Sequence, residues 1–225
     1  NIPAFGPNSE AAKLEGSKAF MKDLFKKYNI PTASYAHFKN FNKAKEYVYK
    51  QGVPIVIKAS GLAEGKGVVI AKTVDEAIET LNAMMNENLH GSAGHEVVIE
   101  EFLEGEEASF FALVDGKTAT PLISVQDHKT AFDGDKGPNT GGMGAYSPAP
   151  CVTPDLSNKI MNEIILPTIK GMASEGCHYR GVLFAGLMIK GNKVNILEFN
   201  IRFGDPECQV LMTLLDSDIV DLLSS

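Results

Sequence analysis

Apolar residues recur every three or four positions in four segments of the chain, and this spacing predicts amphipathic helices. Each segment begins with a side chain that can accept hydrogen bonds from the first helical amides. These expected caps are Ser17, Asn42, Thr73 and Thr153. Glu76 completes a capping box in the third helix. Gly52 is expected to end the second helix, and Pro167 to kink or divide the fourth.

Runs of apolar and β-branched residues lie between the expected helices and predict strands. They cover residues 53–59, 68–71, 96–100, 109–114, 118–123, 181–189 and 193–200. Asp115-Gly116 and Gly191-Asn192 each separate two of these strands, as in β-hairpins. Because hairpins dominate, we expect an α+β fold of largely antiparallel sheets with packed helices, and no regular β-α-β alternation.

The composition is that of an ordinary globular protein, with 44% hydrophobic and 22% charged residues. The 21 Lys and Arg residues against 28 Asp and Glu residues give a formal net charge of −7. No basic run is present, so we expect no nucleic-acid partner. The longest apolar runs, such as residues 110–114, are too short to cross a bilayer, so we expect no membrane partner. Three widely spaced cysteines without a CxxC motif favour reduced thiols and a cytoplasmic location.

The first candidate for chemistry is a glycine-rich loop, residues 60–67, between two expected strands. It is not a Walker A loop, because Gly67 follows Lys66 where Ser or Thr is needed, and no helix follows it as in a Rossmann fingerprint. A protein kinase is also excluded, since its glycine loop precedes the strand lysine, whereas Lys58 precedes this loop. Backbone N–H groups of such a hairpin can close over phosphates, with Lys58 at its base. A plain surface turn is the alternative.

The second candidate is a strand face formed by Glu198, Asn200 and Arg202. Alternation along the expected strand places these three residues on one side, in steps of roughly 7 Å. A carboxylate and an amide oxygen suit Mg²⁺, which usually takes one or two protein ligands together with substrate phosphates. The guanidinium of Arg202 then suits a phosphate oxygen. The alternative is a solvated strand face that carries a salt bridge.

Two further candidates carry weaker signals. The backbone groups of Glu101, Phe102 and Leu103 follow an expected strand and can hydrogen-bond an adenine edge. Glu107 comes just after the turn and can hold ribose hydroxyls; a solvated acidic turn is the alternative. Lys18 comes directly after the first expected cap, where its charge opposes the helix macrodipole. Next to unpaired helix amides it would make an anion site.

The order of these signals along the chain resembles that of the ATP-grasp superfamily, in which two subdomains close on ATP and a metal ion. Within it, the sequence closely resembles the glycinamide ribonucleotide synthetase (phosphoribosylamine–glycine ligase) family. The resembling segments are 6–9, 16–20, 57–68, 126–129, 134–148 and 197–209. The most specific part is residues 127–150, a glycine- and proline-rich segment in which we expect no regular element.

The resemblance implies a set of contacts for each ligand. Adenine contacts fall to Glu100, Glu101, Phe102 and Leu103, and the ribose contact falls to Glu107. Phosphate contacts fall to Lys18, Lys58, Gly61, Gly65, Lys66, Gly67 and Asn139. The implied ligands of Mg²⁺ or Mn²⁺ are Glu198 and Asn200. Arg202 and Lys58 are expected to neutralise charge during the reaction, and Asp205 and Asp127 to contact the amine or glycine.

The implied activity is the ATP-dependent ligation of glycine to 5-phosphoribosylamine through glycyl phosphate. The products are glycinamide ribonucleotide, ADP and phosphate, in purine biosynthesis. The expected partners are therefore ATP, glycine and 5-phosphoribosylamine, and we expect a monomer. Another ATP-grasp acid–amine ligase is one alternative, which would keep the nucleotide site but change residues 127–150. A nucleotide-binding module without turnover is the other.

The resemblance also implies a division of the chain into one ATP-grasp unit with two parts. Residues 1–31 and 100–225 are expected to form a core subdomain, and residues 32–99 a lid subdomain that contains the glycine-rich loop. Such ligases have one further domain before this unit and another after it. The first residue, Asn1, also suggests a piece of a longer protein.

Overall fold

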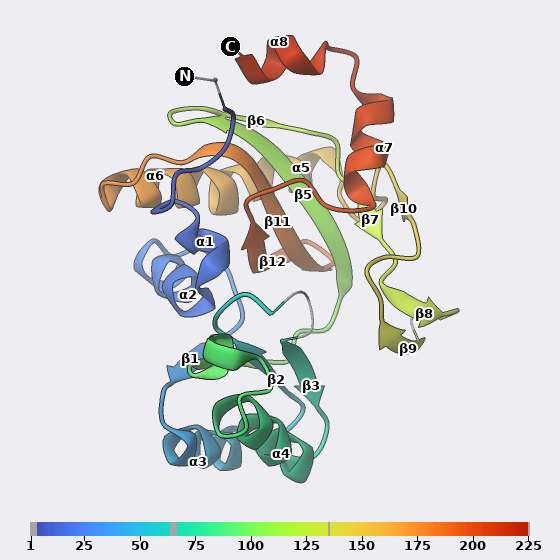
Figure 1. The fold of residues 1–225 in the computed structure, drawn as a ribbon. Coiled ribbons are helices and arrows are strands. Elements are labelled where there is room, and N and C mark those ends of the chain that lie inside the picture. The colour runs from blue at the N-terminus through green and yellow to red at the C-terminus, as the bar shows by residue number, and fades with distance from the viewer. Residues whose placement is uncertain (1–3, 64–66, 135, 225) are drawn as a thin grey trace.

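The computed structural model describes residues 4–63, 67–134 and 136–224, and it contains two separate four-stranded antiparallel sheets (Figure 1). The larger sheet has the order β12-β11-β5-β6. Its strands are β5 (Glu106–Asp115), β6 (Ala119–Pro121), β11 (Arg180–Lys190) and β12 (Lys193–Asn200). Both expected hairpins are confirmed, and their turns use positive φ at Gly116 (100°) and Gly191 (60°). The Asp115 carboxylate accepts hydrogen bonds from the amides of Lys117 and Thr118, which fixes the first turn.

The smaller sheet has the order β1-β4-β2-β3. Its strands are β1 (Tyr35–Phe38), β2 (Ile55–Ala59), β3 (Val68–Ala71) and β4 (Val97–Glu101). Two helices, α3 (Phe41–Gln51) and α4 (Val74–Met85), cover one face of it, and the short helix η1 (Gly91–Gly94) precedes β4 (Figure 1). Strand β1 has no counterpart among the expected strands, because its residues, three half-buried and one exposed, show no clear alternation.

Three of the four expected helix caps are confirmed. Ser17, Thr73 and Thr153 each accept a hydrogen bond from the amide three residues later. The expected cap Asn42 is wrong, because the Asn40 side chain accepts from the amide of Lys43 at 3.1 Å. Asn40 has extended backbone, as a cap requires, whereas Asn42 lies inside the first turn of α3.

The expected division at Pro167 is confirmed. This residue lies at the start of α6 (Leu166–Ser174), which a π-helical turn (Met161–Ile165) separates from α5 (Pro154–Ile160). The remaining helices are α1 (Lys13–Gly16), α2 (Lys18–Lys27), α7 (Glu207–Leu214) and α8 (Ile219–Ser224). Among the described residues, no helix is long and apolar enough to cross a membrane.

Three clusters of buried apolar side chains hold these layers together. The largest joins one face of the larger sheet to α1, α2, α5 and α6. A second cluster, which includes Phe111, Phe184 and Leu211, lies on the opposite face of that sheet next to α7. The third belongs to the smaller sheet and takes its fully buried members from residues 44–99. This interval lies within the predicted lid, whose boundaries and movement stay predictions.

Residues 126–146 form two short antiparallel ladders, so the expectation of no regular element there is wrong. The pairs are β7 (Gln126–Asp127) with β10 (Ala145–Tyr146), and β8 (Thr130–Phe132) with β9 (Lys136–Asn139). Strands of two to four residues are too short to show alternation in a sequence. The amides of Ser109 and Val125 donate to each other's carbonyls at 2.8 and 2.9 Å, which attaches this segment to β5.

Candidate active site

A cleft of about 820 Å³ lies between the larger sheet, the smaller sheet and the start of α2. It brings together residues predicted from separate motifs, namely Lys18, Lys58, Gly67, Glu107, Asp127, Glu198, Asn200, Arg202 and Asp205. Gly61 instead lines a neighbouring hollow of about 440 Å³. Gly65 and Lys66 lie outside the described residues, and the backbone of Asn139 pairs opposite Thr130 in the β8–β9 ladder.

Two lysines from different elements make one part of this cleft positive. Lys58 comes from β2 and is 5% exposed, and Lys18 is the first residue of α2. Burial lowers the pKa of Lys18 and nearby Lys58 lowers it further, while Glu198 acts in the opposite direction. The expectation of unpaired amides at this helix start is wrong, because the backbone and side-chain oxygens of Ser60 accept from Lys18 and Ala19 at 2.8 and 3.2 Å. The Lys18 side chain therefore remains as the group that can bind an anion.

Glu198 and Asn200 lie in β12, and their alternation places both side chains toward the cleft. Strand β12 ends at Asn200, so the expectation that Arg202 continues the same strand is wrong. Arg202 lies in the bend that follows and still lines the cleft. Glu15 supports this bend, because its Oε2 accepts from the amide of Ile201 at 3.0 Å and its Oε1 lies 3.7 Å from Arg202 Nε. Glu15 has no signal of its own in the sequence, since its contacts are almost 190 residues away.

Carboxylates gather at the end of the cleft that lies beside α7. Glu207 is 2% exposed and its Oε1 accepts from the Ser109 hydroxyl at 3.0 Å. Asp127 carries a buried Oδ1 that has no hydrogen-bond partner among the described residues. Burial, and then the charge of Glu207, raise the pKa of Asp127 to about 6. Asp205 is exposed and accepts from the Gln209 amide group at 2.8 Å, and Glu107 lies 3.7 Å from Lys129. This end of the cleft suits a cationic group such as an amine.

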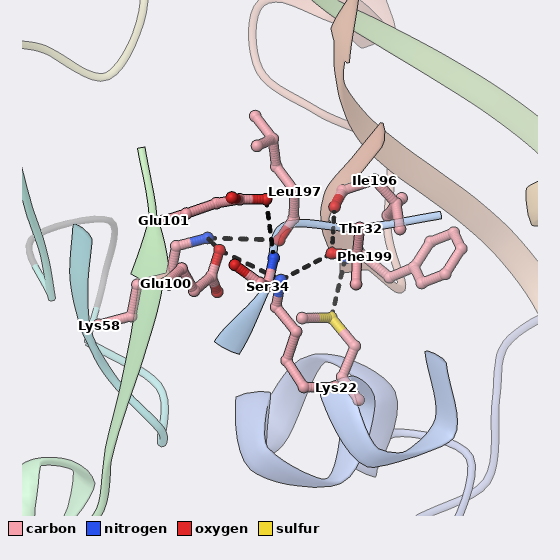
Figure 2. A network of polar contacts seen from close by, with 10 residues as sticks. Lys22, Thr32, Ser34, Lys58, Glu100, Glu101, Ile196, Leu197 and Phe199 are labelled. Carbon is pink, nitrogen blue, oxygen red and sulfur yellow. Dashed lines mark hydrogen bonds and ion pairs between the residues drawn. The ribbon is translucent and has the colours of Figure 1, made fainter. Parts of the chain in front are cut away.

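Residues 100–103, which are predicted to hold adenine, are not among the described residues that line the cleft. Glu100 is 2% exposed, and its Oε2 lies 3.1 Å from Lys22 Nζ and 3.2 Å from Lys58 Nζ. Figure 2 shows Glu100 between the two lysines. Glu101 is held by Ser34, whose amide donates to its carboxylate at 3.0 Å. Phe102 and Leu103 follow the end of β4 and take part in no ladder pair of that strand.

The arrangement can bind a metal–polyphosphate complex. Lys18, Lys58 and Arg202 supply positive charge, while Glu198 and Asn200 supply oxygen donors on one strand face. Within the described residues, no three His, Cys, Asp or Glu side chains come together to hold a metal. Two oxygen donors fit Mg²⁺ or Mn²⁺, because such an ion completes its shell with phosphate oxygens and water.

The two antiparallel sheets, with a cleft between them, form an ATP-grasp fold, as predicted. The family model described as "Phosphoribosylglycinamide synthetase, ATP-grasp (A) domain" matches residues 16–208. The chain belongs to this family, which confirms the resemblance in its motifs.

Similar proteins agree with this assignment. The chloroplastic phosphoribosylamine–glycine ligase of Arabidopsis thaliana is 62% identical over 224 residues, which are 99% of this chain and 42% of that protein. The ligase of Brucella melitensis biotype 1 is 57% identical, with 100% and 52% covered. The crystal structure of the Thermotoga maritima ligase has a TM-score of 0.87 and 43% identity, with 93% and 53% covered. A biotin carboxylase–β,γ-ATP complex from Campylobacter jejuni, with a TM-score of 0.77 and 15% identity, shares the fold alone. The chain thus spans about half the length of the relatives it matches.

Proposed function

We propose that this chain is the ATP-grasp part of a phosphoribosylamine–glycine ligase of purine biosynthesis. A carboxylate oxygen of glycine attacks the γ-phosphorus of ATP, the bond from that phosphorus to the β,γ-bridging oxygen breaks, and ADP leaves. The nitrogen of 5-phosphoribosylamine then attacks the carbonyl carbon of glycyl phosphate. The bond from that carbon to the phosphate oxygen breaks, phosphate leaves, and the nitrogen loses a proton.

The observation that carries this proposal is the meeting of five predicted side chains in one cleft. Lys18, Lys58, Glu198, Asn200 and Arg202 come from three distant stretches of the sequence. In this proposal the chain supplies no covalent nucleophile. The lysines and Arg202 orient the phosphates and oppose their charge, which lowers the barrier through positioning and electrostatics.

Glu198 and Asn200 are the residues that would hold Mg²⁺ or Mn²⁺. Such an ion would help to neutralise the negative charge of the ATP phosphates. Asn139 and the glycine-rich loop, including Gly61, Gly65, Lys66 and Gly67, would complete the phosphate contacts.

The ribose, the adenine and the amine are assigned to residues in and beside the cleft. Glu107 lines it and would hold the ribose. The adenine would lie against the backbone of Glu101, Phe102 and Leu103, with Glu100 Oε1 as a further acceptor, since this oxygen has no partner among the described residues. Asp127 and Asp205 would receive an amine at the acidic end of the cleft.

A binding measurement and an activity assay test this proposal. Calorimetry should detect ATP binding that strengthens with Mg²⁺. In a complete protein that includes this chain, ADP release should depend on glycine together with 5-phosphoribosylamine. Release that depends instead on another acid and amine would support a different ATP-grasp ligase, and ATP binding without release would support a nucleotide-binding module.

The monomeric state, the cytoplasmic location and the absence of nucleic-acid and membrane partners stay predictions. The Arabidopsis relative is a chloroplastic protein. Light scattering on the purified chain tests the monomer directly.

A further inference from the structure

Lys22 carries a positive charge inside the protein without lining the cleft. Its side chain is 0% exposed, and its Nζ lies 3.1 Å from Glu100 Oε2. The Nζ also donates to Thr32 Oγ1 at 2.7 Å and lies 5.9 and 5.7 Å from the ring centres of Phe25 and Tyr35. A buried ammonium is costly to desolvate, yet no contact in the proposed reaction uses it.

Lys22 and Lys58 share a single carboxylate oxygen. Glu100 Oε2 lies 3.1 Å from one Nζ and 3.2 Å from the other (Figure 2). Two cations against one anion leave one positive charge in excess. Lys18 and Glu198, which lie near this trio of Lys22, Lys58 and Glu100, carry opposite formal charges. The excess charge lies at the edge of the cleft, where Lys58 is the member that lines it.

Both lysines are also tied to the same strand of the larger sheet. Lys58 Nζ donates to the carbonyl of Leu197 at 3.3 Å. Lys22 reaches β12 through Thr32, whose hydroxyl donates to the carbonyl of Ile196 at 2.7 Å. Glu198, the expected metal ligand, directly follows Leu197 in this strand. The trio therefore connects the smaller sheet, the start of the chain and the strand that would hold the metal.

We propose that Lys22 is a positioning residue that keeps Lys58 available for the phosphates of the nucleotide by compensating the charge of Glu100. This inference rests on the proposed function. With Lys58 as its only partner, Glu100 would form a neutral pair, and a phosphate would have to compete with that carboxylate for the ammonium. With Lys22 on the same oxygen, the carboxylate is already compensated, and Lys58 keeps a net attraction for an anion.

Calorimetry with ATP and with adenosine tests the proposal. Lys22→Met should weaken ATP binding about tenfold and adenosine binding less than about twofold, because only ATP carries the phosphates. Lys26→Met is the matched control. It removes the same charge from the exposed face of α2 and should change neither affinity. Lys22→Gln, which keeps a hydrogen-bond donor, carries the same expectation if the Met variant does not fold.

The same substitution in a Glu100→Gln background completes a double-mutant cycle. There Lys22→Met should change ATP binding less than about twofold, because no carboxylate remains to capture Lys58. Equal losses for ATP and adenosine, an unchanged ATP affinity, or a tenfold loss that persists in the Glu100→Gln background would each overturn the proposal. A wild-type chain that does not bind ATP would overturn the proposed function itself, and with it this inference.

Discussion

Lys58 and Glu207 are buried polar side chains of the cleft that have partners, whereas the half-buried Asp127 has one oxygen without a partner among the described residues. Lys58 lies against Glu100, and Glu207 accepts a hydrogen bond from Ser109. Asp127 Oδ1 is buried without a hydrogen-bond partner in the part of the chain that the structure describes. A buried carboxylate in this position gains stability by taking up either a proton or a cationic ligand. Its ionisation should therefore be visible in the stability of the protein.

We expect the stability of the wild type, relative to Asp127→Asn, to fall as the pH rises from about 4 to 6. The folded-state pKa of Asp127 is raised to about 6 from an ordinary value of 3.8, by burial first and then by Glu207. Between these two values the folded state holds a proton that the unfolded state has lost, so stability decreases with pH and then levels off above 6. Urea unfolding of both proteins from pH 4 to pH 7.5 measures the difference. A difference independent of pH would contradict the assignment.

Replacing Glu198 with Ala should weaken Mg·ATP binding at least about tenfold and metal-free ATP binding much less. The variant loses a direct oxygen ligand of the metal, whereas the phosphates keep their lysines. Calorimetry with ATP in Mg²⁺ and in EDTA gives both values. Glu79→Ala, at an exposed position of α4, is the control for the loss of one negative charge. Equal losses with and without Mg²⁺ would remove Glu198 from the metal site.

At the scale of elements, the glycine-rich loop is held at both of its described ends. The amide of Gly61 donates to the carbonyl of Ala93 at 3.2 Å, and the carbonyl of Gly67 accepts from Ala59 at 2.8 Å. A Cβ added to Gly61 would lie 2.7 Å from the Cα of Ala93, and one added to Gly67 would lie 2.6 Å from the Cβ of Ala63. Glycine is therefore required by close packing at these ends, in addition to any contact with phosphate.

Gly61→Ala should destabilise the protein by about 1–3 kcal/mol, because its new methyl group meets backbone atoms that cannot easily shift. Gly16→Ala is the matched control, since nothing lies within 4 Å of a Cβ added there. Urea unfolding of both variants at one pH measures the two costs. Equal stability of the two variants would mean that η1 moves freely away from the loop.

We expect the loop to close when a nucleotide binds. Leu62 is 66% exposed and, with Ala63 and Gly67, lines the cleft beside Lys58. A non-hydrolysable ATP analogue should slow hydrogen exchange at the amides of these residues, because phosphate oxygens would accept from them. The β11–β12 turn at Gly191 provides a reference outside the cleft, where exchange should stay constant. Unchanged exchange in the loop at saturating ligand would identify it as a simple turn.

At the scale of the whole molecule, the cleft contains Lys18, Lys58 and Gly67 of the predicted phosphate contacts and both predicted metal contacts. The chain, however, is about half as long as its relatives. We expect Mg·ATP at a hundredfold excess over its Kd to stabilise the chain by about 2.7 kcal/mol, a rise in Tm of roughly 5–10 °C. We expect little glycinamide ribonucleotide, because the acceptor sites of such ligases need walls from the domains on either side.

Thermal melting with and without Mg·ATP checks the first expectation. Mass spectrometry of a mixture of the chain, ATP, glycine and 5-phosphoribosylamine checks the second. Product formation at the rate of a complete ligase would show that this chain holds both acceptor sites by itself.

Features that depend on neighbouring residues follow from the sequence. The cap at Ser17, the turns at Gly116 and Gly191, and the alternation of Glu198 and Asn200 are set by backbone conformation over a few residues. Local rules describe these features well, since each of them restricts φ and ψ or assigns a face directly. The choice of Asn42 as a cap fails by two residues, because two asparagines in that stretch satisfy the same rule.

Contacts between distant residues were decided by the tertiary structure alone. The amides at the start of α2 are satisfied by Ser60, and Glu15 supports the bend at Ile201. The trio of Lys22, Lys58 and Glu100 forms only because two sheets and a helix pack together around it. Residue type and spacing say which groups can pair, but packing of the buried apolar clusters selects which of them meet. The residue types that line the cleft are thus readable in the sequence, while the charge balance around Lys58 follows from packing.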